Sequence, residues 1–149
     1  MKVLLLNGSP RKNGCTYTAL NVVADALKAE GIDAEVFQAG DPDMENVKAA
    51  AAKLKESDAL VVGSPVYWAS PNGQIIEFMD RLASVAGKDM LYKPAAAVAS
   101  ARRAGTTATL DVLTKYFSYH QMPVVSSCYW NMVHGNAPEE VMRDEEGVQ

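Results

Sequence analysis

Short apolar runs alternate along the chain with stretches of helical periodicity. The apolar runs predict strands at Val3–Leu6, Asp33–Phe37, Ala59–Val62, Ala95–Ala99 and Val124 to about Ser127. Apolar side chains spaced three or four residues apart predict the intervening helices, one over about Thr16–Glu30, one with Pro42 in its first turn, one carrying Ile75 to Leu82, and one carrying Leu110 to Phe117. Gly31 is predicted to end the first helix in the left-handed conformation.

This alternation predicts an α/β fold with a doubly wound, five-stranded parallel sheet in the strand order 2-1-3-4-5. Because crossovers between parallel strands are right-handed, few other arrangements are compatible with it. The order reverses beside the first strand, and ligands bind at the carboxyl ends of the strands at such a point. We therefore expect the loops after strands one, three and four to line one crevice.

Composition narrows the class of protein. The 149 residues, 48% of them hydrophobic, predict a single domain over residues 1–149. The net charge of −4 argues against nucleic acid or a membrane surface as a partner. The two cysteines, Cys15 and Cys128, are too few for a disulfide framework and lack metal-ligand spacing, so we predict no metal and a cytoplasmic location. The apolar run at the N-terminus is too short for a signal peptide.

The first loop, Gly8 to Thr16, is rich in groups that bind anions. It leads from a buried strand to a helix N-terminus, where backbone N–H groups and the positive end of the helix dipole converge. Ser9 and Thr16 add hydroxyl donors, and Arg11 adds a guanidinium. The alternative is an ordinary loop in which Thr16 only caps the helix. A nucleotide P-loop is excluded, because Cys15 occupies the position that requires lysine.

The second and third loops offer aromatic rings and donors. Tyr67 and Trp68 follow the third strand, where a flat conjugated ring could stack; alternatively, they cap the core or fill a subunit interface, and for Trp68 both interpretations carry equal weight. The third loop, Ser100 to Thr107, could donate to the polar edge of such a ring, although at least one of its two arginines suits a solvated surface.

No side chain is predicted to be catalytic. His120 and His134 lie outside the three loops, and neither a serine–histidine–aspartate triad nor a carboxylate pair can be read from the sequence. Core or surface roles suit both histidines. An organic cofactor that carries out the chemistry itself fits this absence.

Four segments stand out in order along the chain: LLLNGSPRKNGCT, GSPVYWASPNGQIIEFMDRL, SARRAGTTATLDVL and HQMPVVSSCYWNMVHG. Together they resemble the flavodoxin-fold NAD(P)H-dependent FMN reductase family, in particular its branch that includes iron–sulfur flavoproteins. The resemblance implies FMN as cofactor, with its phosphate held by Ser9, Arg11, Asn13, Cys15 and Thr16. It implies that the ring is held by Pro65, Val66, Tyr67 and Trp68 and by the third loop, namely Ser100, Ala101, Arg102, Arg103 and Gly105. Cys15 replaces a polar side chain and would contribute its backbone N–H.

The resemblance also implies an enzyme of the FMN reductase or quinone reductase type, in which NAD(P)H is co-substrate and a quinone, flavin or nitro compound accepts the electrons. A flavodoxin-type electron carrier for protein partners is the alternative. A homodimer or homotetramer is expected, since Tyr67, Trp68, Tyr129 and Trp130 are many aromatic residues for loops at one edge of a domain.

The chain departs from the family between the second strand and its helix. Gln38 to Pro42 contains no cysteine, so we predict no iron–sulfur cluster. The family has a longer segment here and a further helix after the last strand. We therefore expect residues to be absent between Phe37 and Asp43 or after Gln149, and a naturally short family member is the alternative.

Overall fold

A parallel sheet forms the centre of the molecule. The computed structural model describes all 149 residues. Its main sheet has the order β2-β1-β3-β5-β6, and every neighbouring pair on that path is parallel. The strands are β1 (Lys2–Asn7), β2 (Asp33–Gln38), β3 (Ala59–Tyr67), β5 (Ala95–Ala101) and β6 (Met132–His134), and the short β4 (Ser70–Pro71) pairs antiparallel with the end of β3. The flavodoxin-like strand order 2-1-3-4-5 is thus confirmed.

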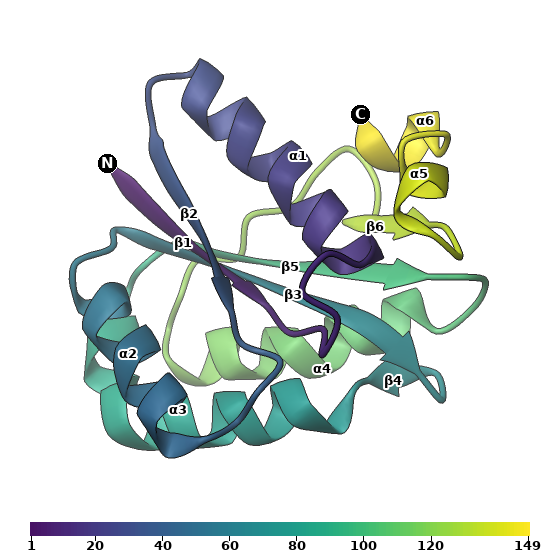
Figure 1. Ribbon diagram of the computed structural model, residues 1–149. Coiled ribbons are helices and arrows are strands. Elements are labelled where there is room, and N and C mark those ends of the chain that lie inside the picture. The colour runs from purple at the N-terminus through teal and green to yellow at the C-terminus, as the bar shows by residue number, and fades with distance from the viewer.

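Helices cover the two faces of the sheet unequally (Figure 1). One face carries α2 (Met44–Lys55), α3 (Gly73–Met90) and α4 (Thr106–Tyr119), and the other carries α1 (Cys15–Ala29) with two single turns, α5 (Pro138–Val141) and α6 (Glu145–Val148). The larger core cluster, around Leu4, Leu60 and Phe78, lies on the three-helix face. The smaller cluster, around Leu5, Leu20 and Val61, lies under α1. No helix is both long and apolar enough to cross a membrane.

An apolar groove of about 440 Å³ remains open beside α1. It is lined by Val23 and Leu27 of α1, by Val98 and Val133 of the sheet, and by the segment from Val125 to Asn131. A long helix packed beside α1 would cover this face in a doubly wound sheet. Here the residues after Gly135 form only the two short turns, so the sheet face beside α1 stays partly uncovered.

The helices agree with their predicted ranges, with one correction. Gly31 has a φ of 74° and ends α1 as expected. The proline predicted in the first turn of the second helix lies outside it, because α2 starts at Met44 and Asp43 is its N-cap. The Asp43 carboxylate accepts the Glu45 N–H at 3.0 Å, and this bond sets the start of the helix.

β3 and β5 continue into residues that were predicted as loops, β3 to Tyr67 and β5 to Ala101. β3 runs on through Pro65 to Tyr67 because its residues from Gly63 to Pro65 pair with Val98 to Ser100 of β5. The chain then returns as β4, with Trp68 and Ala69 as a two-residue turn. Their φ angles of 53° and 59° are left-handed, a conformation that costs non-glycine residues energy and matches the hairpin twist.

The prediction of the last strand at Val124–Ser127 is wrong. Only Val124 forms a bridge to β5, at Ala95, and the sheet's fifth position is filled further on by Met132–His134. Residues between these two contacts leave the sheet and are mostly exposed, including Val125, Tyr129 and Trp130. The apolar pair at Val124 and Val125 has strand-like character, but Ser126 and Ser127 do not bury a sheet face, so the pairing moves to Val133.

Candidate functional site

The three predicted loops converge on one hollow at the carboxyl ends of the strands. Its volume is about 150 Å³. Ten of the predicted residues line it: Ser9, Arg11, Cys15, Thr16, Pro65, Val66, Tyr67, Ser100, Ala101 and Arg102. The hollow is thus built from the ends of β1, β3 and β5, as the strand order requires.

Four predicted residues do not line this hollow. Asn13 is exposed on the first loop, and Trp68 is fully exposed at the tip of the β3–β4 hairpin. Arg103 is exposed, and its carbonyl oxygen lies 3.0 Å from the His134 ring. Gly105 joins the second and third loops, because a Cβ there would lie 2.6 Å from Ala69 Cα, and its φ of 98° favours glycine.

Three lining residues were not predicted, namely Gly14, Gly135 and Asn136. Gly135 and Asn136 follow β6, and the Gly135 N–H donates to the Ala101 carbonyl at 2.9 Å. Because the last strand was placed before its true position, the turn after it was not considered. The sequence signal that could have located this turn is Gly135, shortly after the apolar pair Met132 and Val133.

The N-terminus of α1 offers unused hydrogen-bond donors to the hollow. Its N-cap is Gly14, which has no side chain to cap the helix, and no acidic residue stands in the first turn. The N–H groups of Cys15, Thr16 and Tyr17 have no hydrogen-bond partner within the protein. Arg11, on the hollow's rim, forms no ion pair. These groups together form a place for a phosphate.

Hydroxyl groups link the first and third loops inside the hollow. Thr16 Oγ1 and Ser100 Oγ lie 2.7 Å apart, and both side chains are buried. Because one hydroxyl donates to the other, one O–H in the pair stays available to a ligand. Ser9 Oγ accepts the Arg11 N–H at 3.1 Å, so the Ser9 hydroxyl can also still donate.

The Cys15 side chain turns toward Gly135. Its Sγ lies 3.6 Å from the Gly135 carbonyl oxygen, and burial raises the pKa of the thiol. A thiol with a raised pKa stays protonated at neutral pH and is a poor nucleophile. Its backbone N–H is therefore the group it can offer at this site. No three His, Cys, Asp or Glu side chains gather as metal ligands anywhere in the molecule.

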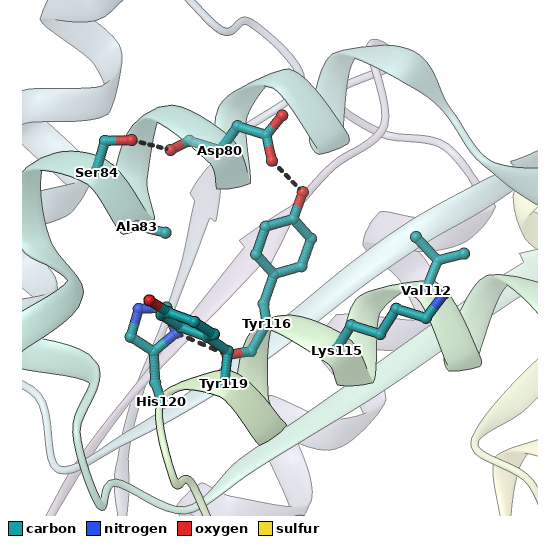
Figure 2. A pocket seen from close by; sticks show the side chains of 8 residues that line it. All are labelled: Asp80, Ala83, Ser84, Val112, Lys115, Tyr116, Tyr119 and His120. Atoms are coloured by element: carbon teal, nitrogen blue, oxygen red, sulfur yellow. Dashed lines mark hydrogen bonds between the residues drawn. The ribbon is translucent and has the colours of Figure 1, made fainter.

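A larger hollow lies elsewhere, between α3 and α4, with a volume of about 690 Å³ (Figure 2). The Tyr116 hydroxyl donates to Asp80 across it, and burial together with this carboxylate raises the pKa of Tyr116. His120 is buried beneath, with Nδ1 2.7 Å from the Tyr116 carbonyl oxygen. None of the loop residues reaches this hollow, so size alone does not identify the functional site.

Comparison with known proteins gives a family for the chain. The model of the family described as NADPH-dependent FMN reductase matches residues 1–137. An iron–sulfur flavoprotein of Methanocaldococcus jannaschii is 28% identical over 175 aligned positions, which cover the whole chain and 91% of that protein. Since the chain has 149 residues, that relative carries residues inside the aligned region that have no counterpart here.

Two further proteins are similar over a large part of the chain. An NADPH azoreductase of a Bacillus species is 29% identical over 108 residues, which cover 68% of this chain and 59% of the azoreductase. A solved NAD(P)H:acceptor oxidoreductase from Paracoccus denitrificans superposes with a TM-score of 0.73 at 20% identity, covering 87% of this chain and 77% of that one. The structural likeness establishes the shared fold.

Proposed function

The chain belongs to the NADPH-dependent FMN reductase family, and we propose that FMN binds across its three loops and passes electrons from NAD(P)H to a quinone, a free flavin or a nitro compound. FMN is the family's cofactor and NAD(P)H its electron donor, so the protein is a flavin-dependent NAD(P)H oxidoreductase. The flavin supplies the redox chemistry when bound, and the protein's residues bind and orient it.

The observation that carries this proposal is the open N-terminus of α1. We assign the FMN phosphate to the unpartnered N–H groups of Cys15 and Thr16, the Ser9 hydroxyl and the Arg11 guanidinium, with Asn13 beside them. A phosphate dianion suits this place because the helix dipole is positive here and no carboxylate lies in the first turn. The residues at this helix start therefore fit a phosphate group in their present positions.

We assign the flavin ring to two sides of the hollow. One side is formed by Pro65, Val66 and Tyr67, and the other by Ser100, Ala101 and Arg102. The neighbouring residues Trp68, Arg103 and Gly105 complete the proposed ring site. The hollow's 150 Å³ is small beside the roughly 300–1,000 Å³ of typical cofactor sites, so part of the ring must extend past it. The open N-terminus of α4 adds unpartnered N–H groups at Thr106 to Ala108, which favour negative charge nearby.

The test is an absorption spectrum of the purified protein followed by anaerobic titration with NADPH and NADH. We expect flavin bands and bleaching by a stoichiometric amount of nicotinamide, and steady turnover once a quinone is added. Bleaching that takes hours with either nicotinamide, but is rapid with a reduced protein partner, would instead support the flavodoxin-type electron carrier.

We further propose that two or four copies assemble. Trp68 is 101% exposed, and Tyr129 and Trp130 are each 58% exposed, which is unusual for aromatic side chains of this size. Tyr129 and Trp130 also border the apolar groove beside α1, so a second copy offers both apolar side chains and a groove that can receive them. A strictly monomeric mass in light scattering at micromolar concentration would contradict this.

A further inference from the structure

The backbone of the first loop is held from the core side by three amide side chains. The Asn72 amide donates to the Gly8 carbonyl at 2.7 Å, and the Gln38 amide donates to the Ser9 carbonyl at 2.6 Å. The Asn7 amide donates to the Lys12 carbonyl at 3.3 Å. These side chains come from three places, the ends of β1 and β2 and the N-cap of α3.

Ser9 is the residue on which these bonds concentrate. Its N–H donates to Asn7 Oδ1 at 3.2 Å, and its carbonyl oxygen accepts from Gln38 Nε2. Asn7 Nδ2 in turn donates to Gln38 Oε1 at 2.7 Å, which fixes the orientation of both amides. Ser9 is 4% exposed and Asn7 is fully buried, so these bonds form largely out of water.

Gly40 makes room for this arrangement. A Cβ at position 40 would lie 2.1 Å from the Ser9 carbonyl oxygen and 2.8 Å from Gln38 Nε2. No real side chain can occupy that space, so glycine is required where the chain after β2 passes under the first loop. The contact between Gln38 and Ser9 therefore depends on a backbone that approaches closely.

The hydrogen bonds to the Ser9 backbone also affect the orientation of its hydroxyl group. The bonds from the amide side chains fix the Ser9 backbone, and its Oγ is held by accepting the Arg11 N–H. This bond engages one of the hydroxyl's two lone pairs and leaves the O–H to donate into the hollow. The same bond places the backbone of Arg11, which lines the hollow.

We propose that Asn7 and Gln38, supported by Asn72, are positioning residues that make the site select a flavin phosphate ester over the unphosphorylated flavin. They touch the loop and lie behind it, so they act through Ser9 and Arg11. Without the Gln38 amide the Ser9 peptide can rotate, and a rotated carbonyl would present a partial negative charge toward the phosphate. This inference rests on the proposed function, which puts the phosphate at the first loop.

The test compares affinities for FMN and riboflavin, measured by quenching of flavin fluorescence on the apo-protein. For the natural chain we expect FMN to bind at least tenfold more tightly, since riboflavin lacks the phosphate. Gln38→Leu should lose about tenfold in FMN affinity and leave riboflavin affinity nearly unchanged. A general loosening of the fold would weaken both ligands together, and an unchanged ratio would overturn the inference.

The matched control is Asn46→Ala. The Asn46 amide lies in the same corner and donates to the carbonyls of Gln38 and Asp41 at 3.0 and 2.8 Å, but not to the first loop. Asn46→Ala should therefore leave the ratio of FMN affinity to riboflavin affinity unchanged. Gln38→Met, which keeps the side-chain length, provides the same comparison if the leucine variant does not fold.

The outcomes separate the two proposals. If the natural chain binds FMN and riboflavin equally, the phosphate assignment itself is wrong and the role of Gln38 falls with it. If the natural chain prefers FMN and Gln38→Leu retains the full preference, the positioning role is wrong while the proposed function stands.

Discussion

All four long helices start at the carboxyl edge of the sheet, but they start in two different ways. α2 and α3 each have a side-chain cap: Asp43 accepts from Glu45 N–H, and Asn72 accepts from Ile75 N–H at 2.8 Å. α1 and α4 begin after Gly14 and Gly105, which have no side chain to cap them. Of the four helices, only the uncapped α1 contributes residues to the hollow, namely Cys15 and Thr16 beside its N-cap Gly14.

We infer from this difference that the helix starts without a cap leave donors for a ligand, whereas the caps of α2 and α3 contribute to stability. A capped start has its N–H groups satisfied within the protein, and a cap is worth roughly 1 kcal/mol. An uncapped start gives up that contribution and keeps donors available for a ligand. α1 reaches the hollow with Cys15 and Thr16, and the loop before α4 lines it with Ala101 and Arg102, so the two uncapped starts adjoin the proposed cofactor site. Among the four helices only α2 has an acidic residue in its first turn, Glu45.

Giving α1 the cap it lacks should have the largest effect. In Gly14→Asp the carboxylate would occupy the phosphate position and repel a bound phosphate, at a cost of roughly 4 kcal/mol or about a thousandfold in FMN affinity. Gly14 has a φ of −90°, so the backbone accepts a side chain, and a Cβ would lie 3.2 Å from Arg11 Cβ. Calorimetric titration of the apo-protein with FMN measures the loss.

Gly14→Asn is the control for this change. It supplies a neutral cap of the same size, so it should lower FMN affinity less than the aspartate does while both variants leave the apo-protein at least as stable to heat. Equal losses with aspartate and asparagine would mean that steric blocking, and not charge, governs this helix start.

The glycine at the start of α4 has a structural reason as well. Gly105→Ala forces a side chain into a left-handed backbone with a φ of 98° and toward Ala69, which should destabilise the fold by about 2–4 kcal/mol. Gly73, the first residue of the capped α3, has open space around its Cβ position. Gly73→Ala should therefore be neutral or stabilise slightly, and urea unfolding of both variants measures the two changes in stability. Equal changes in stability for Gly105→Ala and Gly73→Ala would contradict the prediction that position 105 requires glycine.

Removing the guanidinium tests the electrostatic side of the uncapped site. Arg11→Ala should weaken FMN binding by roughly 1.5–3 kcal/mol, or about 10- to 150-fold, because a charge-assisted bond to the phosphate is lost. Lys12→Ala is the matched control, since Lys12 carries the same charge one residue further on and does not line the hollow. An Arg11 variant with unchanged FMN affinity would show that the phosphate lies elsewhere.

The fold and the loops of the site could be predicted from the sequence because each rests on local patterns. Buried runs such as Val3–Leu6 mark the strands, and the strand order follows from crossover handedness. The position of the last strand could not be predicted, because Val124 and Val125 are as strand-like as Met132 and Val133. Only pairing with Ala99 to Ala101 of β5 decides between them.

The amides behind the first loop were also beyond sequence reasoning. Asn7, Gln38 and Asn72 are distant along the chain, and each alone is an ordinary polar residue at an element end. Their role depends on β1 lying between β2 and β3, which brings three element ends under Ser9. Asn72 could have been recognised as a helix cap, but not as the donor to Gly8.

The smallest effect should come from the capped helix that lies away from the site. Asp43→Ala removes the α2 cap and should lower the free energy of unfolding by about 1 kcal/mol, while Asp43→Asn, which can still accept the Glu45 N–H, should cost much less. Neither variant should alter FMN affinity, because no residue of α2 lines the hollow. Thermal unfolding of the apo-protein and FMN titration of both variants measure the two quantities separately. The inference fails if Asp43→Ala lowers the free energy of FMN binding as much as it lowers the free energy of unfolding. The cap of α2 would then contribute to FMN binding as well as to stability.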